Sequence, residues 1–213
     1  MWQVPGSVIE RTQVGMGNVE RAVEFYGRTA GRYLSSRPHG LREPVLASQR
    51  NAVIELADPR STDSVLDIGC GAGRLAALLR PRVASLCGVD ASRAMLALAG
   101  PWLDEQVHAR LESLVLDRTF DLVICCGVLD FVEDAGAGLR AIRRHLAPDG
   151  RAVVSAAAPS VVGIGYALVR RLQGVRVRLY TSDRLRDIAA SCGLRCTKAR
   201  TLRGGSVAVV LAR

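Results

Sequence analysis

The chain has 213 residues, 49% hydrophobic and 4% aromatic, with a formal net charge of +9 at pH 7. This length suits one domain with one core, and so few aromatic side chains provide little surface for stacking on nucleic-acid bases. All but one of the basic residues are arginines, and they are spread along the whole chain. This distribution indicates a general bias in amino-acid composition rather than a nucleic-acid-binding patch.

Sequence signals for membrane insertion and for cysteine chemistry are weak. No run of 18 apolar residues occurs, and residues 1–15 lack a basic start followed by an apolar stretch. We therefore expect neither a membrane span nor a signal peptide, and a cytoplasmic location. The six cysteines show no C-x-x-C spacing, so we expect no metal site and no disulfide.

Two helices are predicted before residue 58. Apolar and aromatic positions at helical spacing predict an amphipathic helix over 17–34. Breaker residues at 35–40 predict a loop, and a second helix is expected over 42–57.

Strands and helices then alternate, which predicts a parallel, doubly wound α/β sheet. The expected strands are 65–68, 83–89, 106–110, 120–126 and 151–157, and the expected helices are 74–79, 92–100 and 135–146. Residues 175–180 suit an ordered loop or a short strand, and a helix capped by Ser182 follows over 182–191. Segments 194–202 and 206–211 flank Arg203-Gly204-Gly205, which is typical of an antiparallel hairpin.

Residues 65–73 read VLDIGCGAG, an apolar strand that runs into three alternating glycines. Glycines let the backbone approach a ligand closely, and the start of a following helix attracts anions. The dinucleotide pattern G-x-G-x-x-G would need its third glycine at position 74, where this chain has Arg74. Asp67 would repel a pyrophosphate but suits an amino group. Asp90, at the tip of the next strand, is placed to bind both hydroxyls of a ribose.

These residues resemble the class I S-adenosylmethionine-dependent methyltransferases. VLDIGCGAG is similar to their first motif and GVDAS at 88–92 to their second, while FDLVI at 120–124 and LAPDGR at 146–151 are similar to later segments. The resemblance implies a mostly parallel, seven-stranded Rossmann-like sheet with a C-terminal antiparallel hairpin. It also implies one methyltransferase domain over 1–213, with a helical lid at 1–58 and a cofactor-binding core at 60–213.

The resemblance further implies S-adenosylmethionine as cofactor and S-adenosylhomocysteine as product. Asp67 would orient the methionyl amine, the glycine loop would line the methionyl and ribose portions, and Asp90 would hold the ribose. Glu112 would bind the adenine amine, although the family commonly has an acid near position 110, which is arginine here. The full set of expected cofactor contacts is Tyr33, Asp67, Gly69, Cys70, Gly71, Asp90, Ala91, Met95, Leu111, Glu112 and Cys126.

For methyl transfer, the protein mainly has to align the acceptor with the methyl group and exclude water. Many small-molecule members of this family have a histidine where this chain has Phe131, which weakens the case for an imidazole base. Asp130 and His39 are the remaining candidates for a base. The expected substrate contacts are Tyr26, Phe131, Tyr166 and Tyr180.

The hypothesis is a methyltransferase acting on a small molecule, most readily at oxygen and less so at nitrogen or carbon. A nucleic-acid methyltransferase is the alternative favoured by charge, but the segment after the fourth strand reads CCGV, without the N/D-P-P-Y or Pro-Cys patterns of DNA methyltransferases. A catalytically inactive, cofactor-binding partner subunit is a third hypothesis, kept open by Arg110 and Phe131. The sequence carries no signal for an oligomeric state.

Overall fold

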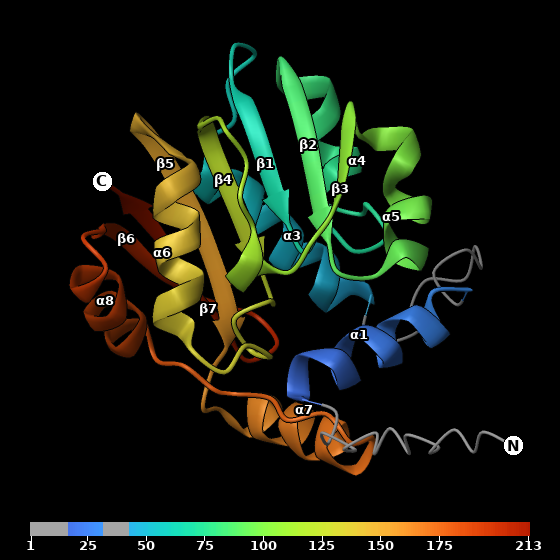
Figure 1. Ribbon diagram of the computed structural model, residues 1–213. Helices are drawn as coiled ribbons and strands as arrows, with labels where there is room; N and C mark the ends of the chain where they lie inside the picture. The colour runs from blue at the N-terminus through green and yellow to red at the C-terminus, as the bar shows by residue number, and fades with distance from the viewer. Residues whose placement is uncertain (1–16, 32–42) are drawn as a thin grey trace, which may run out of the picture.

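The computed structural model describes residues 17–31 and 43–213. Its centre is a seven-stranded sheet in the order β3-β2-β1-β4-β5-β7-β6 (Figure 1). The first five strands of that order are parallel, and β7 and β6 run antiparallel to their neighbours. The bounds are β1 Ser64–Ile68, β2 Ser85–Asp90, β3 Glu105–His108, β4 Phe120–Cys126, β5 Leu146–Ala157, β6 Arg195–Leu202 and β7 Ser206–Ala212. The predicted fold class, including the C-terminal hairpin, is confirmed.

Helices cover both faces of the sheet and its carboxyl edge (Figure 1). Their bounds are α1 Asn18–Thr29, α3 Glu43–Ala57, α4 Ala76–Leu79, α5 Arg93–Ala99, α6 Ala135–His145, α7 Val161–Leu172 and α8 Ser182–Ser191. Short 3-10 turns lie at η2 Arg80–Arg82, η3 Gly100–Trp102 and η4 Leu111–Ser113. None of the helices within 17–31 and 43–213 has the length and apolar character needed to cross a membrane.

Alternating residues of the central strands explain the two covered faces. Leu66 on β1 and Val123 on β4 belong to one buried cluster, which includes residues of α6 and α8. Their neighbours Val65 and Leu122 belong to a second cluster, which includes residues of α3 and α4. Because successive side chains of a strand point to opposite faces, the near-continuous apolar runs of β1 and β4 fit strands that are buried on both faces.

The structure corrects the sequence-based elements in three places. The helix after the glycines begins at Ala76, two residues later than expected, and has only four residues. The helix α7 was not predicted, because Gly163, Gly165 and several β-branched residues weaken its helical signal. The cap of α8 is Thr181, whose hydroxyl accepts a hydrogen bond from the Arg184 N–H, and not Ser182. Residues 175–180 form an ordered loop, one of the two expected alternatives.

Arg151 ties the end of α3 to the start of the parallel part of β5. Its guanidinium donates to the carbonyl oxygens of Ala57 and Asp58, at 2.5 Å each, and to the Asp63 carboxylate at 2.7 Å. Asp63 is 3% exposed and also accepts from the Arg60 N–H. The arginine therefore satisfies the carbonyls at the end of α3 and neutralises a buried acid.

Replacing Arg151 with methionine should lower the free energy of unfolding by about 3 kcal/mol, because Asp63 would remain buried without its cation. Arg200→Gln is the matched control: it breaks an exposed pair with Glu55 and should cost less than about 1 kcal/mol. Urea unfolding of both variants measures the difference. Equal losses would contradict the role assigned to Arg151.

Candidate functional site

The turn after β1 is built on glycines with positive φ. Gly69, Gly71 and Gly73 have φ values of 73°, 54° and 76°, a region that residues with a Cβ rarely adopt. A Cβ on Gly69 would overlap Val128, whereas one on Gly71 would meet nothing within 4 Å. The glycine loop is therefore packed on one side against the segment after β4 and open on the other toward a cavity.

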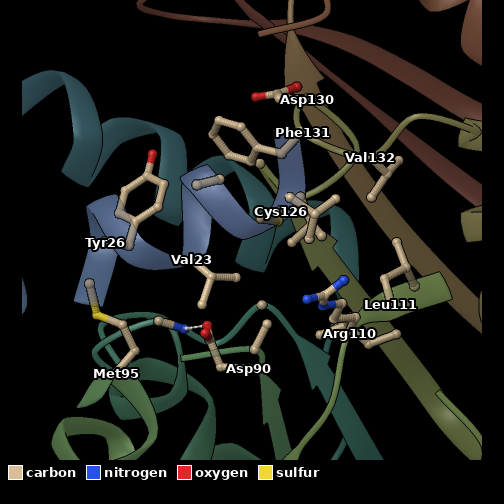
Figure 2. A pocket seen from close by; sticks show the side chains of 18 of the residues that line it. Val23, Tyr26, Asp90, Met95, Arg110, Leu111, Cys126, Asp130, Phe131 and Val132 are labelled. Atoms are coloured by element: carbon tan, nitrogen blue, oxygen red, sulfur yellow. Dashed lines mark hydrogen bonds between the residues drawn. The ribbon is translucent and has the colours of Figure 1, made fainter. Parts of the chain in front are cut away.

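Asp90 fixes the position of this loop. Its Oδ2 accepts a 2.9 Å hydrogen bond from the Gly71 N–H (Figure 2). Its Oδ1 accepts one of 2.8 Å from the Ser92 N–H. Burial raises the pKa of Asp90, and these two N–H donors act in the opposite direction. Each oxygen keeps a second lone pair, so the carboxylate can still accept hydrogen bonds from a ligand.

A first cavity of about 330 Å³ lies between α1 and the carboxyl ends of β1, β2 and β4 (Figure 2). It brings together most of the predicted cofactor residues, although they come from four separate segments of the chain, at or after the ends of β1, β2, β3 and β4. Those that line it are Gly69, Gly71, Asp90, Ala91, Met95, Leu111, Glu112 and Cys126. Val19, Ala22 and Val23 of α1 line it too. The sequence predicted Val19 and Val23 on the apolar face of this helix but did not assign any of the three to the site.

A second cavity of about 760 Å³ lies on the other side of the glycine loop, against α3, α7 and the β6–β7 turn. Asp67 and Cys70 line this cavity, as do Arg50, Arg74 and Arg170. The two cavities share a wall, so one ligand could extend from the first into the second. The residues of this shared wall are Tyr26, Gly69, Ala72, Cys126, Gly127, Asp130 and Tyr166.

Asp67 and Glu112 each have an oxygen atom that is buried without a hydrogen-bond partner among the described residues. Burial, and next the charge of Asp90, raises the pKa of Asp67 to about 7. Buried polar atoms in native proteins are nearly always satisfied, so each orphan oxygen indicates a missing donor. Both residues line a cavity, which makes a ligand with two separate N–H donors a suitable occupant.

Asp130 lies deep in the shared wall. It is 4% exposed, and its Oδ1 accepts a 2.9 Å hydrogen bond from the Ala157 N–H. Burial raises the pKa of Asp130 to about 7, partly offset by that hydrogen bond. A carboxyl group with such a pKa can exchange a proton near neutral pH.

The helices α1 and α7 contact each other over the site. The hydroxyls of Tyr26 and Tyr166 lie 3.3 Å apart, and the Arg170 guanidinium lies 4.5 Å from the Phe25 ring centroid. Asn18, at the start of α1, donates from Nδ2 to the Phe131 carbonyl at 2.8 Å. Asn18 had no role in the sequence analysis, because its partners are more than a hundred residues away.

The remaining predicted residues fall in different places. Tyr26, Phe131 and Tyr166 line the first cavity, as expected for contacts with a ligand. Tyr180 is the exception: it is buried in the core, its hydroxyl donates to the Leu129 carbonyl, and it lines neither cavity, so the expected substrate contact is not supported. Tyr33 and His39 lie outside the described residues.

The chain is similar to several methyltransferases. It is 36% identical over 104 residues to the mitochondrial ubiquinone biosynthesis O-methyltransferase of Schizosaccharomyces pombe, covering 45% of this chain and 38% of that protein. To the ubiquinone biosynthesis O-methyltransferase of Pseudomonas paraeruginosa it is 34% identical over 100 residues, covering 43% of each. The chain thus spans about two fifths of the length of these curated relatives.

A solved structure shares the fold over nearly the whole chain. Magnesium protoporphyrin IX methyltransferase from Synechocystis PCC 6803, solved with bound S-adenosylhomocysteine, superimposes with a TM-score of 0.72 at 19% identity and covers 92% of this chain and 99% of that chain. At this identity the likeness shows the fold alone. A family model described as a methyltransferase domain matches residues 39–199, more than half of the sequence, and the chain therefore belongs to the methyltransferase domain family.

Proposed function

We propose that this chain is an S-adenosylmethionine-dependent methyltransferase that transfers a methyl group to a small-molecule acceptor, at an oxygen atom. The single observation that carries the proposal is the orphan Oδ2 of Asp67, buried beside the glycine loop and next to Asp90. A cationic amine near this atom would satisfy it and favour its charged form. Asp90 and the orphan Oε2 of Glu112 supply matching acceptors for ribose hydroxyls and for the adenine amine.

The residues fit this cofactor along its length. The adenine would lie in the first cavity between Met95 and Leu111, with Glu112 at its edge, and the methionyl amine would lie near Asp67 in the second. When bound, the cofactor supplies an electrophilic methyl group on a sulfonium that is already a good leaving group. The solved methyltransferase with bound S-adenosylhomocysteine supports this choice of ligand, because its fold is the same.

The protein then has to align the acceptor and exclude water. The predicted lid at 1–58, of which the structure describes α1 and α3, suits the second task, because α1 lines the first cavity and α3 the second. Asp130 suits the removal of a proton: it lies in the shared wall, and its carboxylate would take the proton of an acceptor hydroxyl as the new oxygen–carbon bond forms. The N–H of Ala157 orients that carboxylate.

Oxygen is the preferred acceptor atom because the curated relatives are O-methyltransferases by name. Nitrogen ranks second, since a structure of the N-methyltransferase NodS from Bradyrhizobium japonicum has the same fold, with a TM-score of 0.67 at 18% identity, covering 87% of this chain and 97% of that chain. The second cavity, of about 760 Å³, has the volume of a small-molecule site, which favours a small acceptor over a nucleic acid. The cytoplasmic location expected from the sequence stays a prediction.

Asp67→Asn should abolish the rise in melting temperature that saturating S-adenosylhomocysteine gives the wild type, because the amine loses its carboxylate. Without ligand, the same variant should be more stable at pH 8 by about 1–3 kcal/mol. The folded-state pKa of about 7 lies above the unfolded value of 3.8, so the cost of Asp67 grows as the pH rises from about 4 to about 7 and stays constant above that. The gain of the variant should therefore vanish as the pH falls toward 4.

Asp121→Asn is the control for this prediction. Asp121 is an acid on β4 that binds Ser64 at the opposite end of β1 and lines neither cavity. This variant should keep the full ligand-induced shift. Differential scanning fluorimetry with and without ligand measures both proteins, and an unchanged shift in Asp67→Asn would overturn the cofactor assignment.

Asp130→Asn should slow methyl transfer by about 100-fold or more and flatten its pH dependence. In the wild type the rate should rise with pH and level off above about pH 7, because only the ionised carboxyl accepts a proton. Asparagine can still accept from the Ala157 N–H, so cofactor binding should change little. Because burial raises the pKa of Asp130 to about 7, the variant should be more stable than the wild type at pH 8, and a loss of rate would not come from unfolding. An acceptor is first found by label transfer from methyl-labelled S-adenosylmethionine to a metabolite extract of the host.

Two outcomes of that assay would count against the proposal. A wild-type rate and pH profile in Asp130→Asn would exclude Asp130 as the base. No transfer from the purified chain to any extract component, together with intact cofactor binding, would favour the inactive partner subunit instead.

A further inference from the structure

The helix α7 has an apolar face that points away from the molecule. Five of its large apolar side chains, which we call the outer face, are between 51% and 89% exposed and line neither cavity. They are Val161, Ile164, Leu168, Val169 and Leu172. Their helical spacing places them along one side, while Gly163, Tyr166 and Arg170 on the other side line the second cavity. Figure 1 shows α7 at the periphery, beneath the carboxyl ends of the strands.

The exposure is unusual within this structure. Only two other large apolar side chains of the described residues are as exposed, Val115 and Val162, the second also on α7; Trp102 follows at 44%. Exposed apolar residues scattered singly are normal in proteins, whereas a contiguous apolar stripe marks an interaction surface. The outer face is therefore a candidate docking surface.

The segment that contains this surface is basic. The sequence has no aspartate or glutamate from residue 152 to residue 182, but it has Arg170, Arg171, Arg176 and Arg178 within that stretch. Arg171 in the last turn of α7 and Arg176 in the loop after it are exposed. Arg170 and Arg178 contact the protein, through aromatic rings and through the Val132 carbonyl respectively. An apolar stripe with exposed arginines is the pattern of helices that lie in the surface of an anionic bilayer.

We propose that the outer face of α7 docks on an anionic lipid surface, with its apolar side chains in the headgroup region and Arg171 and Arg176 near the lipid phosphates. Charge decides against a second copy of the chain as the occupant. Two copies packed through this face would bring their arginines together without any acidic residue from the same segments to pair with them. An anionic surface offers the opposite charge.

Docking has a consequence for the acceptor, which rests on the proposed function. The same helix lines the second cavity with Val162 and Tyr166, so a docked α7 would place the cover of that cavity at the lipid surface. An apolar acceptor dissolved in the bilayer would then have a short route to the site. The docking itself does not depend on methyl transfer.

The experiment measures flotation of the full chain with vesicles of phosphatidylcholine alone and of phosphatidylcholine mixed with phosphatidylglycerol. The wild type should float with the mixed vesicles and not with the neutral ones, and added salt should weaken binding. Leu168→Gln with Leu172→Gln, which leaves the charge unchanged and keeps good helix formers, should weaken binding on the order of tenfold or more. Arg171→Gln with Arg176→Gln should weaken it about fivefold for each charge removed.

Matched controls separate the surface from general stickiness and net charge. Val115→Gln removes an apolar side chain that is 66% exposed elsewhere and should leave binding unchanged. Arg93→Gln with Arg195→Gln lowers the net charge by the same amount on other elements and should have a smaller effect than the α7 pair. All variants should keep the melting-temperature shift with S-adenosylhomocysteine, which tests the proposed function separately.

Three results would overturn the proposal. They are no binding of the wild type to mixed vesicles, unchanged binding of the double leucine variant, and a wild-type dimer in solution that the double leucine variant converts to monomer. The last would assign the outer face to a second copy of the chain.

Discussion

The burial of Asp67 in the middle of the sheet is the constraint on which the site depends. The residue pairs in register with Gly88 of β2 and Ile124 of β4, so its backbone is held on both sides by parallel strands. Its carboxyl group is 2% exposed and lacks a partner for one oxygen among the described residues. Leaving a buried acceptor unsatisfied costs about 1–3 kcal/mol, and a structural role would be served as well by an apolar residue. A buried carboxyl group at position 67 is therefore best explained as a contact with a ligand.

The surrounding parts follow from that position. Asp67 lines the second cavity and Asp90 the first, with the glycine loop between them. One ligand can reach both acids only if that loop leaves space, and the open side of Gly71 leaves it on the side of the first cavity. Asp90 holds the same loop through the Gly71 N–H, which couples the second strand to the geometry around the first. The apolar covers α1 and α7 then close the site from the carboxyl edge, held together through Tyr26 and Tyr166.

The two parts of the site differ in how far the sequence could predict them. The cofactor side depends on short local patterns: an apolar strand, alternating glycines and an acid about twenty residues on, each fixed by the chemistry of its own segment. Glu112, weaker as a sequence signal, still lines the first cavity. The acceptor side depends on contacts between distant segments, such as Asn18 with the Phe131 carbonyl, and no local pattern encodes these. Tyr180 was predicted as a substrate contact because it lies between β5 and α8, but it packs into the core, and no local pattern distinguishes these two environments.

The helix α7 shows why the acceptor side is hard to predict from the sequence. At its start, Gly163 packs so closely on the Ala158 carbonyl that a Cβ would overlap it, which joins the helix to the end of β5. Near its end, Arg170 stacks on the rings of Phe25, Tyr26 and Tyr166. The close backbone contact of Gly163 and the contacts of Arg170 with the three rings hold the inner face of α7 against the protein. Packing therefore places little restriction on the side chains of the outer face. Exposed apolar residues at such positions lower solubility and add nothing to the core, which is the physical reason to assign them to contact with a surface outside the chain.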